Sequence, residues 1–320
     1  NVIQKSGADV VVNCAEGDWN LNAFQACLHT RTHCLDLGSH IEVTKAQLAL
    51  SKEFREIGRT AITGCGAVPG VGNVMLRHAA KKFDSIETRE AGFAWDSNIK
   101  KFVVPFSIQR VLEEFTMPAP YIANRKWRTK QPTETAANRF YRSIGYQKSF
   151  LVDHAETFTF YHYFKHKGVR NIRFYAGFPD HSAQVIKTLI DLTFHAKKSV
   201  RYNGGTVQPD AFLSQMLKRL PRPRGYKEWE NLWVEIKGFK GRKKKTVLME
   251  CVVPPLRGWE DAGCNVDTGM PASIIAQMIK EGEITKRGSF APEGIVPEKP
   301  FFKELRRRKM TVYENGERIN

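Results

Sequence analysis

Residues 8–14, Ala8-Asp9-Val10-Val11-Val12-Asn13-Cys14, form the apolar, β-branched run that a buried parallel strand requires. Apolar residues then recur at helical spacing over residues 20–29, and a second strand-like run from His33 to Gly38 ends on a glycine. The alternation continues with a helix over 44–57, a strand over 60–64 and a helix over 72–82. This rhythm predicts an α/β fold built on a doubly wound, Rossmann-type parallel sheet.

The pattern changes after residue 84, where strands and helices no longer alternate regularly. Strands of a mixed or antiparallel sheet are predicted at 85–93, 102–105, 171–178, 232–237 and 246–253. Helices are predicted at 108–115, 182–192 and 208–220, then at 271–281 and 300–309, and a turn at 203–205. We therefore expect residues 1–84 plus 265–320 to form the first domain and residues 85–264 an inserted α+β domain.

The composition is that of an ordinary globular protein, with 320 residues, 42% of them apolar and 26% charged. No stretch approaches the ~18 apolar residues that span a bilayer, so we expect no membrane segment. The first residues contain neither an initiator Met nor an apolar signal region, and we interpret them as the middle of a protein. Six cysteines occur without a CxxC pair, which favours reduced, mostly buried thiols and a cytoplasmic location: Cys14, Cys27, Cys34, Cys65, Cys251 and Cys264.

The net charge of +17 is compatible with a nucleic-acid-binding or assembly module, or with a basic surface suited to anionic small molecules. The densest basic run, residues 237–245, lies between two predicted strands, so a solvated hairpin tip explains it without a partner. Basic residues are otherwise spread along the chain. We therefore do not expect nucleic acid as a partner.

Polar residues follow the three predicted strands of the first domain, at 13–17, 36–40 and 64–70. Ligands of doubly wound sheets bind outside the carboxyl ends of the strands. These segments are thus candidates for contacts to a cofactor or substrate, although each can equally be a structural turn.

The third strand end, Gly64-x-Gly66-x-x-x-Gly70, looks like a dinucleotide fingerprint between a strand and a helix. Two strand–helix units already precede it, however, and Pro69 removes one N–H donor that a phosphate would use. We expect this loop to close the far side of the site instead.

Two other kinds of site are not favoured. Cys27, His29, His33 and Cys34 resemble a metal cluster, but strand alternation points the last two to opposite faces. His154-Ala155-Glu156 and the histidine at 162 can reach a cleft, yet a strand with one polar face explains them equally well. There is no GxSxG elbow of a serine hydrolase.

Several motifs, in this order and spacing, resemble those of the saccharopine dehydrogenase family. Near the start they are Val10-Val11-Val12-Asn13-Cys14-Ala15, His33-x-Leu35-Asp36-Leu37-Gly38 and Gly66-x-x-Pro69-Gly70-x-x-Asn73. Near the end they are Gly269-Met270-Pro271-Ala272, Ile284-Thr285-Lys286-Arg287-Gly288 and Ala291-Pro292-Glu293-x-Ile295-Val296-Pro297. The lysine 6-dehydrogenase branch is the most similar, through Asp36-Leu37-Gly38-x-His40-Ile41 and Asn203-Gly204-x-x-Val207-x-Pro209.

This resemblance implies a nucleotide-binding domain completed by the C-terminal helices, with a substrate and dimerisation domain inserted, and a homodimer. It implies NAD or NADP and a small amino acid substrate, such as lysine or saccharopine, and a βαβ unit with the Gly-rich phosphate loop before residue 1. Two points leave the substrate open: Val68 stands where saccharopine-forming reductases have an acidic residue, and the lysine 6-dehydrogenase branch has an aromatic near Gly17.

The function expected is therefore hydride transfer from a CH–NH group with formation of an imine. Such chemistry needs a proton acceptor, and Asp36 and His40 are the candidates, although Asp36 can equally cap the next turn. Arg173 is a candidate for a substrate carboxylate. The expected cofactor contacts are Asn13, Cys14, Ala15, Leu37, Gly38 and Gly66. A non-catalytic scaffold of the same fold is the alternative.

Overall fold

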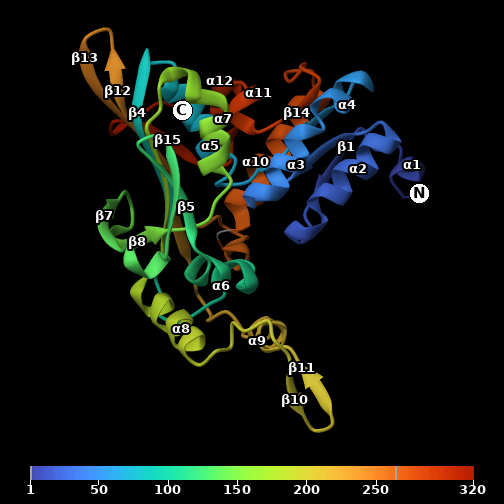
Figure 1. Cartoon of the computed structure of the whole chain (residues 1–320), viewed down its shortest axis with the longest axis vertical. Coiled ribbons are helices and arrows are strands. Elements are labelled where there is room, and N and C mark those ends of the chain that lie inside the picture. The colour runs from blue at the N-terminus through green and yellow to red at the C-terminus, as the bar shows by residue number, and fades with distance from the viewer. Residues whose placement is uncertain (1, 264) are drawn as a thin grey trace.

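A computed structural model describes residues 2–263 and 265–320. A four-stranded parallel sheet lies beside a ten-stranded sheet, which is called the large sheet below (Figure 1). The first is a parallel sheet with the strand order β1-β2-β3-β14. Its strands are β1 (Val10–Asn13), β2 (His33–Asp36), β3 (Thr60–Ile62) and β14 (Gly288–Phe290). The predicted parallel α/β sheet is confirmed, and its last strand comes from the far end of the chain.

Helices cover both faces of this parallel sheet, as a doubly wound fold requires. On one face, Cys34 and Ala61 pack with Phe24 and Phe54 from the helices α2 (Asn20–Thr30) and α4 (Ser51–Glu56). On the other face lies α10 (Asn265–Lys280), against β1 and β2. The helix predicted over 44–57 is two helices, α3 (Ile41–Ala49) and α4, which meet at Leu50.

The second sheet has ten strands in the order β16-β15-β13-β12-β4-β9-β5-β6, and the hairpin β7–β8 pairs with β9 through β8. The long central strands are β4 (Ser85–Ser97), β9 (Asn171–Gly177), β12 (Glu228–Lys240) and β13 (Lys243–Val253). The others are β5 (Ala119–Ala123), β6 (Lys126–Lys130), β7 (Ala137–Tyr141), β8 (Gly145–Leu151), β15 (Thr311–Glu314) and β16 (Glu317–Arg318). The predicted mixed sheet is confirmed, but the strand predicted at 102–105 is wrong, since this segment forms neither helix nor strand.

One face of the large sheet is buried by helices that come from both halves of the chain. Helix α5 (Val71–Ala80) lies against β12 and β13, and α11 (Pro292–Ile295) and α12 (Glu298–Arg307) pack on α5. Further along this sheet, α7 (Glu156–Phe164) packs on β9. Three further helices lie in the lower part of the molecule in Figure 1: α6 (Ile108–Thr116), α8 (Asp180–Asp191) and α9 (Pro209–Leu217).

The domain division expected from the sequence, 1–84 plus 265–320 and 85–264, stays a prediction, and one segment of the first part pairs with a strand of the second. Residues 311–318 do not join the parallel sheet; they pair as β15 and β16 with β13 of the large sheet. Val312 is buried there and extends the core of the large sheet.

Two hairpins extend from the body of the protein. The predicted turn at Asn203-Gly204 joins β10 (Val200–Tyr202) to β11 (Gly205–Val207), which project at the bottom of Figure 1. The basic run 237–245 is the end of the β12–β13 hairpin, which confirms the interpretation of this charge run as a hairpin tip.

The thiols are mostly buried, as predicted. Cys27, Cys34, Cys65 and Cys251 are buried and free, Cys14 is exposed, and Cys264 lies outside the described residues. Within the described part of the chain, no helix has the length and apolar character to cross a membrane.

Candidate active site

A cavity of about 300 Å³ lies where the carboxyl ends of β1 and β2 face the large sheet. The parallel sheet contributes residues 15–18, 37–40 and 67–68, which belong to the loops that follow its first three strands. The opposite walls come from α6, the start of α10, and single residues of β4 and β12. Three segments predicted from strand ends therefore meet at one cavity.

Three of the six predicted cofactor contacts line this cavity, Ala15, Leu37 and Gly38, and so does the candidate proton acceptor His40. The other three predicted cofactor contacts are not among its lining residues: Asn13, Cys14 and Gly66. Asn13 contacts the cavity wall from behind. Its amide donates a hydrogen bond of 2.8 Å to Oδ1 of Asn20, which does line the cavity.

Asp36 is fully buried and does not line the cavity. Its carboxylate accepts hydrogen bonds from the backbone N–H groups of Gly38 (3.0 Å) and Gly64 (2.8 Å) and from the side chains of Thr63 and Gln47. Burial raises the pKa of Asp36, and these donors oppose that rise. Asp36 thus joins the ends of β2 and β3, which matches the turn-capping role that the sequence left open and not that of a proton acceptor.

Several N–H groups of the loop from Gly64 to Gly70 are already bonded within the protein, so these groups are not available to a phosphate. The N–H groups of Gly64 and Cys65 donate to Asp36, and that of Gly70 donates to Oδ1 of Asn73 at 2.8 Å. The next two N–H groups, at residues 71 and 72, donate within the loop. The loop closes one side of the cavity with Ala67 and Val68, as expected from the sequence.

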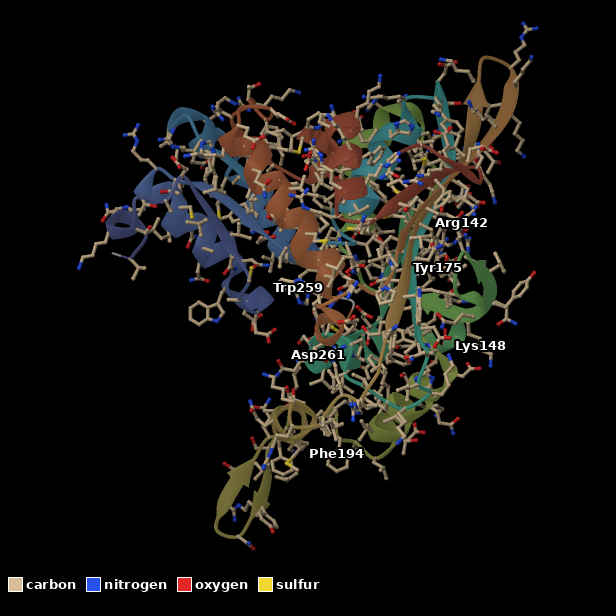
Figure 2. All side chains as sticks on the ribbon, turned by 180° about the vertical axis from the view of Figure 1, so that it is seen from behind. Arg142, Lys148, Tyr175, Phe194, Trp259 and Asp261 are labelled. Carbon is tan, nitrogen blue, oxygen red and sulfur yellow. The ribbon has the colours of Figure 1, made fainter. Side chains whose placement is uncertain are left out.

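Arg173 lies on the wrong face of the large sheet to reach the cavity. It binds Glu90 at 3.3 Å, on the same side of β9 as Tyr175, which Figure 2 labels on the side away from the parallel sheet. The intervening Phe174 points to the opposite, buried face. Strand alternation explains the difference, since successive side chains of a strand point to opposite faces.

Carboxylates dominate the lining of the cavity, in a protein whose net charge is +17. They are Glu16, Asp18, Glu113, Glu114, Glu230 and Asp267. Among the described lining residues, Arg110 is the single Lys or Arg. Burial raises the pKa of both Glu114 and Asp267 to about 7, and the Asp267 carboxyl also interacts with Glu230. The cavity therefore suits a cationic ligand. Arg110, which lies 3.5 Å from Glu113 and 3.7 Å from Glu114, is the side chain of this lining that an anionic group would contact.

Two imidazoles also line the cavity. His40 lies 3.9 Å from Glu113, and burial, together with Arg110, lowers its pKa. His154 is buried, its Nδ1 is bonded to the carboxylate of Glu156, and its ring stacks on Phe174 with the centroids 4.0 Å apart. An imidazole ring can accept a proton near neutral pH.

Comparison with known proteins identifies the family. Residues 66–310 match the family model described as the saccharopine dehydrogenase C-terminal domain. The chain belongs to the saccharopine dehydrogenase family. The predictions of this family and of a saccharopine dehydrogenase-like enzyme are thereby confirmed.

Two curated relatives resemble nearly the whole chain. Carboxyaminopropylagmatine dehydrogenase of Synechocystis sp. is 26% identical over 95% of this chain and 79% of the relative. Carboxynorspermidine synthase of Vibrio cholerae is 25% identical over 95% of this chain and 77% of the relative. A solved structure of apo saccharopine dehydrogenase (L-Glu forming) from Saccharomyces cerevisiae has the same fold, with a TM-score of 0.75, 13% identity, and coverage of 99% of this chain and 87% of that one.

The sequence did not predict most of the cavity wall that the large sheet and its helices supply. Arg110, Glu113 and Glu114 stand on α6, whose helical pattern is visible in the sequence but whose position is not. The sequence left two interpretations open for His154 and Glu156, a pair that reaches a cleft or a strand with one polar face. The strand is wrong, because Glu156 begins α7, and His154 lines the cavity. A histidine two residues before a buried glutamate, at the start of a helix, is the signal that marks this pair.

Proposed function

We propose that the protein is an NAD- or NADP-dependent oxidoreductase that acts on the CH–NH group of a small amine bearing a carboxylate. The observation that carries this proposal is the meeting of the β1 and β2 ends with two imidazoles and six carboxylates around one cavity. The family supports dehydrogenase chemistry. Ligands of such sheets bind at this edge, which supports the place.

The wall at the strand ends fits a nicotinamide ring. Ala15, Gly38 and Ala67 are small and Leu37 is apolar, so backbone and short side chains face the cavity there. The nicotinamide group supplies the hydride acceptor in such dehydrogenases. In the loop from Gly64 to Gly70, the N–H groups of Gly64, Cys65 and Gly70 are bonded within the protein and Pro69 has none, which leaves few donors for a pyrophosphate. We therefore assign no residue of that loop to phosphate binding.

The opposite wall supports a substrate with both positive and negative groups. Ammonium or guanidinium nitrogens bind to carboxylates such as Glu113 and Glu230, and a substrate carboxylate binds to Arg110. The names of both curated relatives describe amines that carry a carboxyl group. Lysine and saccharopine, proposed from the resemblance to the lysine 6-dehydrogenase branch, carry the same kinds of charge. We propose a carboxylated di- or polyamine as the substrate class.

The reaction has two parts. A hydride moves from the carbon next to nitrogen to the nicotinamide, and the N–H proton moves to a base of the protein. The product is an imine that water can hydrolyse. His40 and His154 both line the cavity and can accept that proton. His40 therefore remains a candidate base, whereas Asp36 is a residue that positions the strand ends.

The test follows reduced nicotinamide absorbance with NAD and with NADP, against lysine, saccharopine, carboxyaminopropylagmatine and carboxynorspermidine. The reverse reaction uses an amine, an aldehyde and the reduced cofactor. We expect turnover with at least one substrate that carries two nitrogens and a carboxylate. No absorbance change with any pair, from a protein that melts cooperatively and binds NAD(P) by calorimetry, contradicts the proposal.

We also propose a homodimer. In its support, Phe140 and Tyr146 on the β7–β8 hairpin contact each other with ring centroids 5.4 Å apart while remaining 61% and 81% exposed. Exposed aromatic clusters are typical of protein contacts. Light scattering at micromolar concentration tests this, and a monomeric mass contradicts it.

A further inference from the structure

Behind the cavity wall lies a buried group of polar side chains that the reaction above does not use. It begins at His154, whose Nδ1 is bonded to Glu156. Glu156 is fully buried at the start of α7 and lies near the buried guanidinium of Arg89 on β4. Glu293 also lies near Arg89, and its carboxylate accepts a hydrogen bond of 2.7 Å from Asn73. Asn73 in turn accepts the N–H of Gly70, in the loop that closes the other side of the cavity.

Arg89 is an unusual member, because a buried arginine is normally well bonded. Only 2% of it is exposed, and its guanidinium lies 3.2 Å from the centre of the Phe160 ring. Its Nη1 reaches the carbonyl of Arg173 at 3.4 Å, while Nε and Nη2 have no hydrogen-bond partner among the described residues. Burial lowers the pKa of Arg89 to about 9, and the charges of Glu156, Glu293 and Glu90 oppose that fall. The carboxylates and this cation therefore stabilise one another.

The contact between His154 and Glu156 determines which ring nitrogen carries the proton. A carboxylate is only an acceptor, so a neutral imidazole bonded to it must keep its proton on Nδ1. Nε2 then has a free lone pair, on the ring that lines the cavity. Stacking on Phe174, with an interplanar angle of 4°, holds the ring plane.

We propose that Glu156 and Arg89 are positioning residues, which fix His154 as the tautomer whose unprotonated Nε2 faces the substrate. The proposal rests on the proposed dehydrogenase function only for its kinetic consequence. The positive charge of Arg89 lies near the buried carboxylate of Glu156, and Glu156 orients the imidazole. His154 is then the proton acceptor for the substrate N–H, and His40 contacts another part of the substrate.

Other charged groups lie near His154 and are left unchanged in the test below. His40, the residue before α3, and Glu114 on α6 interact electrostatically with His154, and Arg110 and Asp153 interact with both of them. None of them is bonded to Nδ1, which Glu156 occupies.

The first experiment is independent of activity. The protein is labelled with ¹⁵N-histidine, the resonances of residue 154 are assigned by their loss in His154→Asn, and long-range ¹H–¹⁵N correlations report the tautomer. We expect Nδ1–H with unprotonated Nε2 in the wild type. We expect Glu156→Gln, whose amide can donate to Nδ1, to move the proton to Nε2. A wild-type ring with its proton on Nε2 overturns the proposal.

Glu293→Gln is the matched control, since it removes a second carboxylate near Arg89 that bonds Asn73 and no imidazole. We expect it to leave the tautomer of His154 unchanged. Because Arg89→Met removes a buried charge and can unfold the protein, Arg89→Lys is the second variant at this position. We expect Arg89→Lys to keep the wild-type tautomer and to retain most of the activity that Arg89→Met loses.

The kinetic experiment uses any substrate that the absorbance test identifies. We expect Glu156→Gln to lower kcat by about 100-fold with KM changed by less than about threefold, the range that misplaced acid–base groups show. Glu293→Gln is expected within about threefold of wild type in both. If Glu156→Gln lowers stability and kcat only as much as Glu293→Gln does, the role of Glu156 is merely structural and the proposal is wrong. If no substrate is turned over, the proposed function fails while the tautomer experiment still decides this one.

Discussion

Gly70 lies so close to Gly66 that a Cβ atom added to Gly70 would be 1.7 Å from the carbonyl oxygen of Gly66. The backbone of Gly70 has a φ of +137°, which other residues rarely adopt, and its N–H is bonded to Asn73. This close approach gives the loop beside the cavity its shape, because the carbonyl of Gly66 also accepts the N–H of Val71 at the start of α5.

Replacing Gly70 by Ala should therefore destabilise the protein strongly and displace the cavity wall. We expect a loss of about 4 kcal/mol or more in the free energy of unfolding, since backbone must move. Gly58→Ala is the matched control: its φ is +69° but no atom lies within 4 Å of the added Cβ, so strain of about 1 kcal/mol is expected. Urea unfolding measures both. Equal losses would contradict the close contact between Gly66 and Gly70.

Replacing Asp36 by Ala should reduce stability rather than act on the chemical step alone. Four donors lose their acceptor, and buried hydrogen bonds to a charged group contribute about 1.5–3 kcal/mol each, with strong overlap. We expect a total loss of about 3–5 kcal/mol in urea unfolding. A variant with wild-type stability and abolished turnover would instead assign Asp36 to catalysis.

Glu114 should make stability depend on pH. Burial raises its pKa from 4.5 to about 7, so the folded protein holds this proton more tightly than the unfolded chain. The contribution of Glu114 to the free energy of unfolding is therefore fully present below about pH 4.5, and it is lost as the pH rises through about 7. The loss is on the order of 3 kcal/mol.

Glu114→Gln removes that titration, and the variant should become more stable relative to wild type as the pH rises from 5 to 8. The exposed Glu42→Gln serves as the control, since the Glu42 side chain is 82% exposed. Unfolding by urea at several pH values checks the slope. A constant difference between wild type and Glu114→Gln over this range is the contrary result.

Replacing Arg110 and replacing Arg173 should have different effects on the KM for the substrate. Arg110 lines the cavity, whereas Arg173 binds Glu90 on the other face of the large sheet. We expect Arg110→Ala to raise KM for a carboxylated amine by about 10- to 100-fold, the value of a charged hydrogen bond. Arg173→Ala should change kcat and KM by less than about twofold. The opposite pattern in steady-state kinetics would restore Arg173 as the carboxylate ligand.

The parallel sheet was predictable because its residues follow local rules. Runs such as Val10 to Val12 have the composition of a buried strand, and polar residues follow each strand at the edge where ligands bind. Ala15, Leu37, Gly38 and His40 line the cavity for that reason. Asp36 fits the same pattern, yet four neighbouring donors enclose it, and a single sequence does not distinguish an enclosed carboxylate from an exposed one.

The other wall was not predictable, because it depends on how distant elements pack. Glu114 and His154 meet only when α6 and the start of α7 fold over the end of the parallel sheet. The strands between 119 and 151 were missed as well: β6 is exposed along its whole length, so its residues carry no alternating apolar pattern. Arg173 was misplaced because its face of β9 follows from sheet packing and not from its residue type.

The pairing of β3 with β14 determines the order in which the molecule can assemble. Thr60 donates a hydrogen bond to the carbonyl of Lys286, 226 positions further along, and Gly288 lies beside Thr60 in the sheet. During synthesis, β3 therefore keeps one open edge until residues 288–290 have left the ribosome. Contacts of such separation fold slowly, and an open strand edge is a place where chains associate. The centre of the large sheet, where β12 pairs with both β4 and β13, can therefore form before β14 completes the parallel sheet.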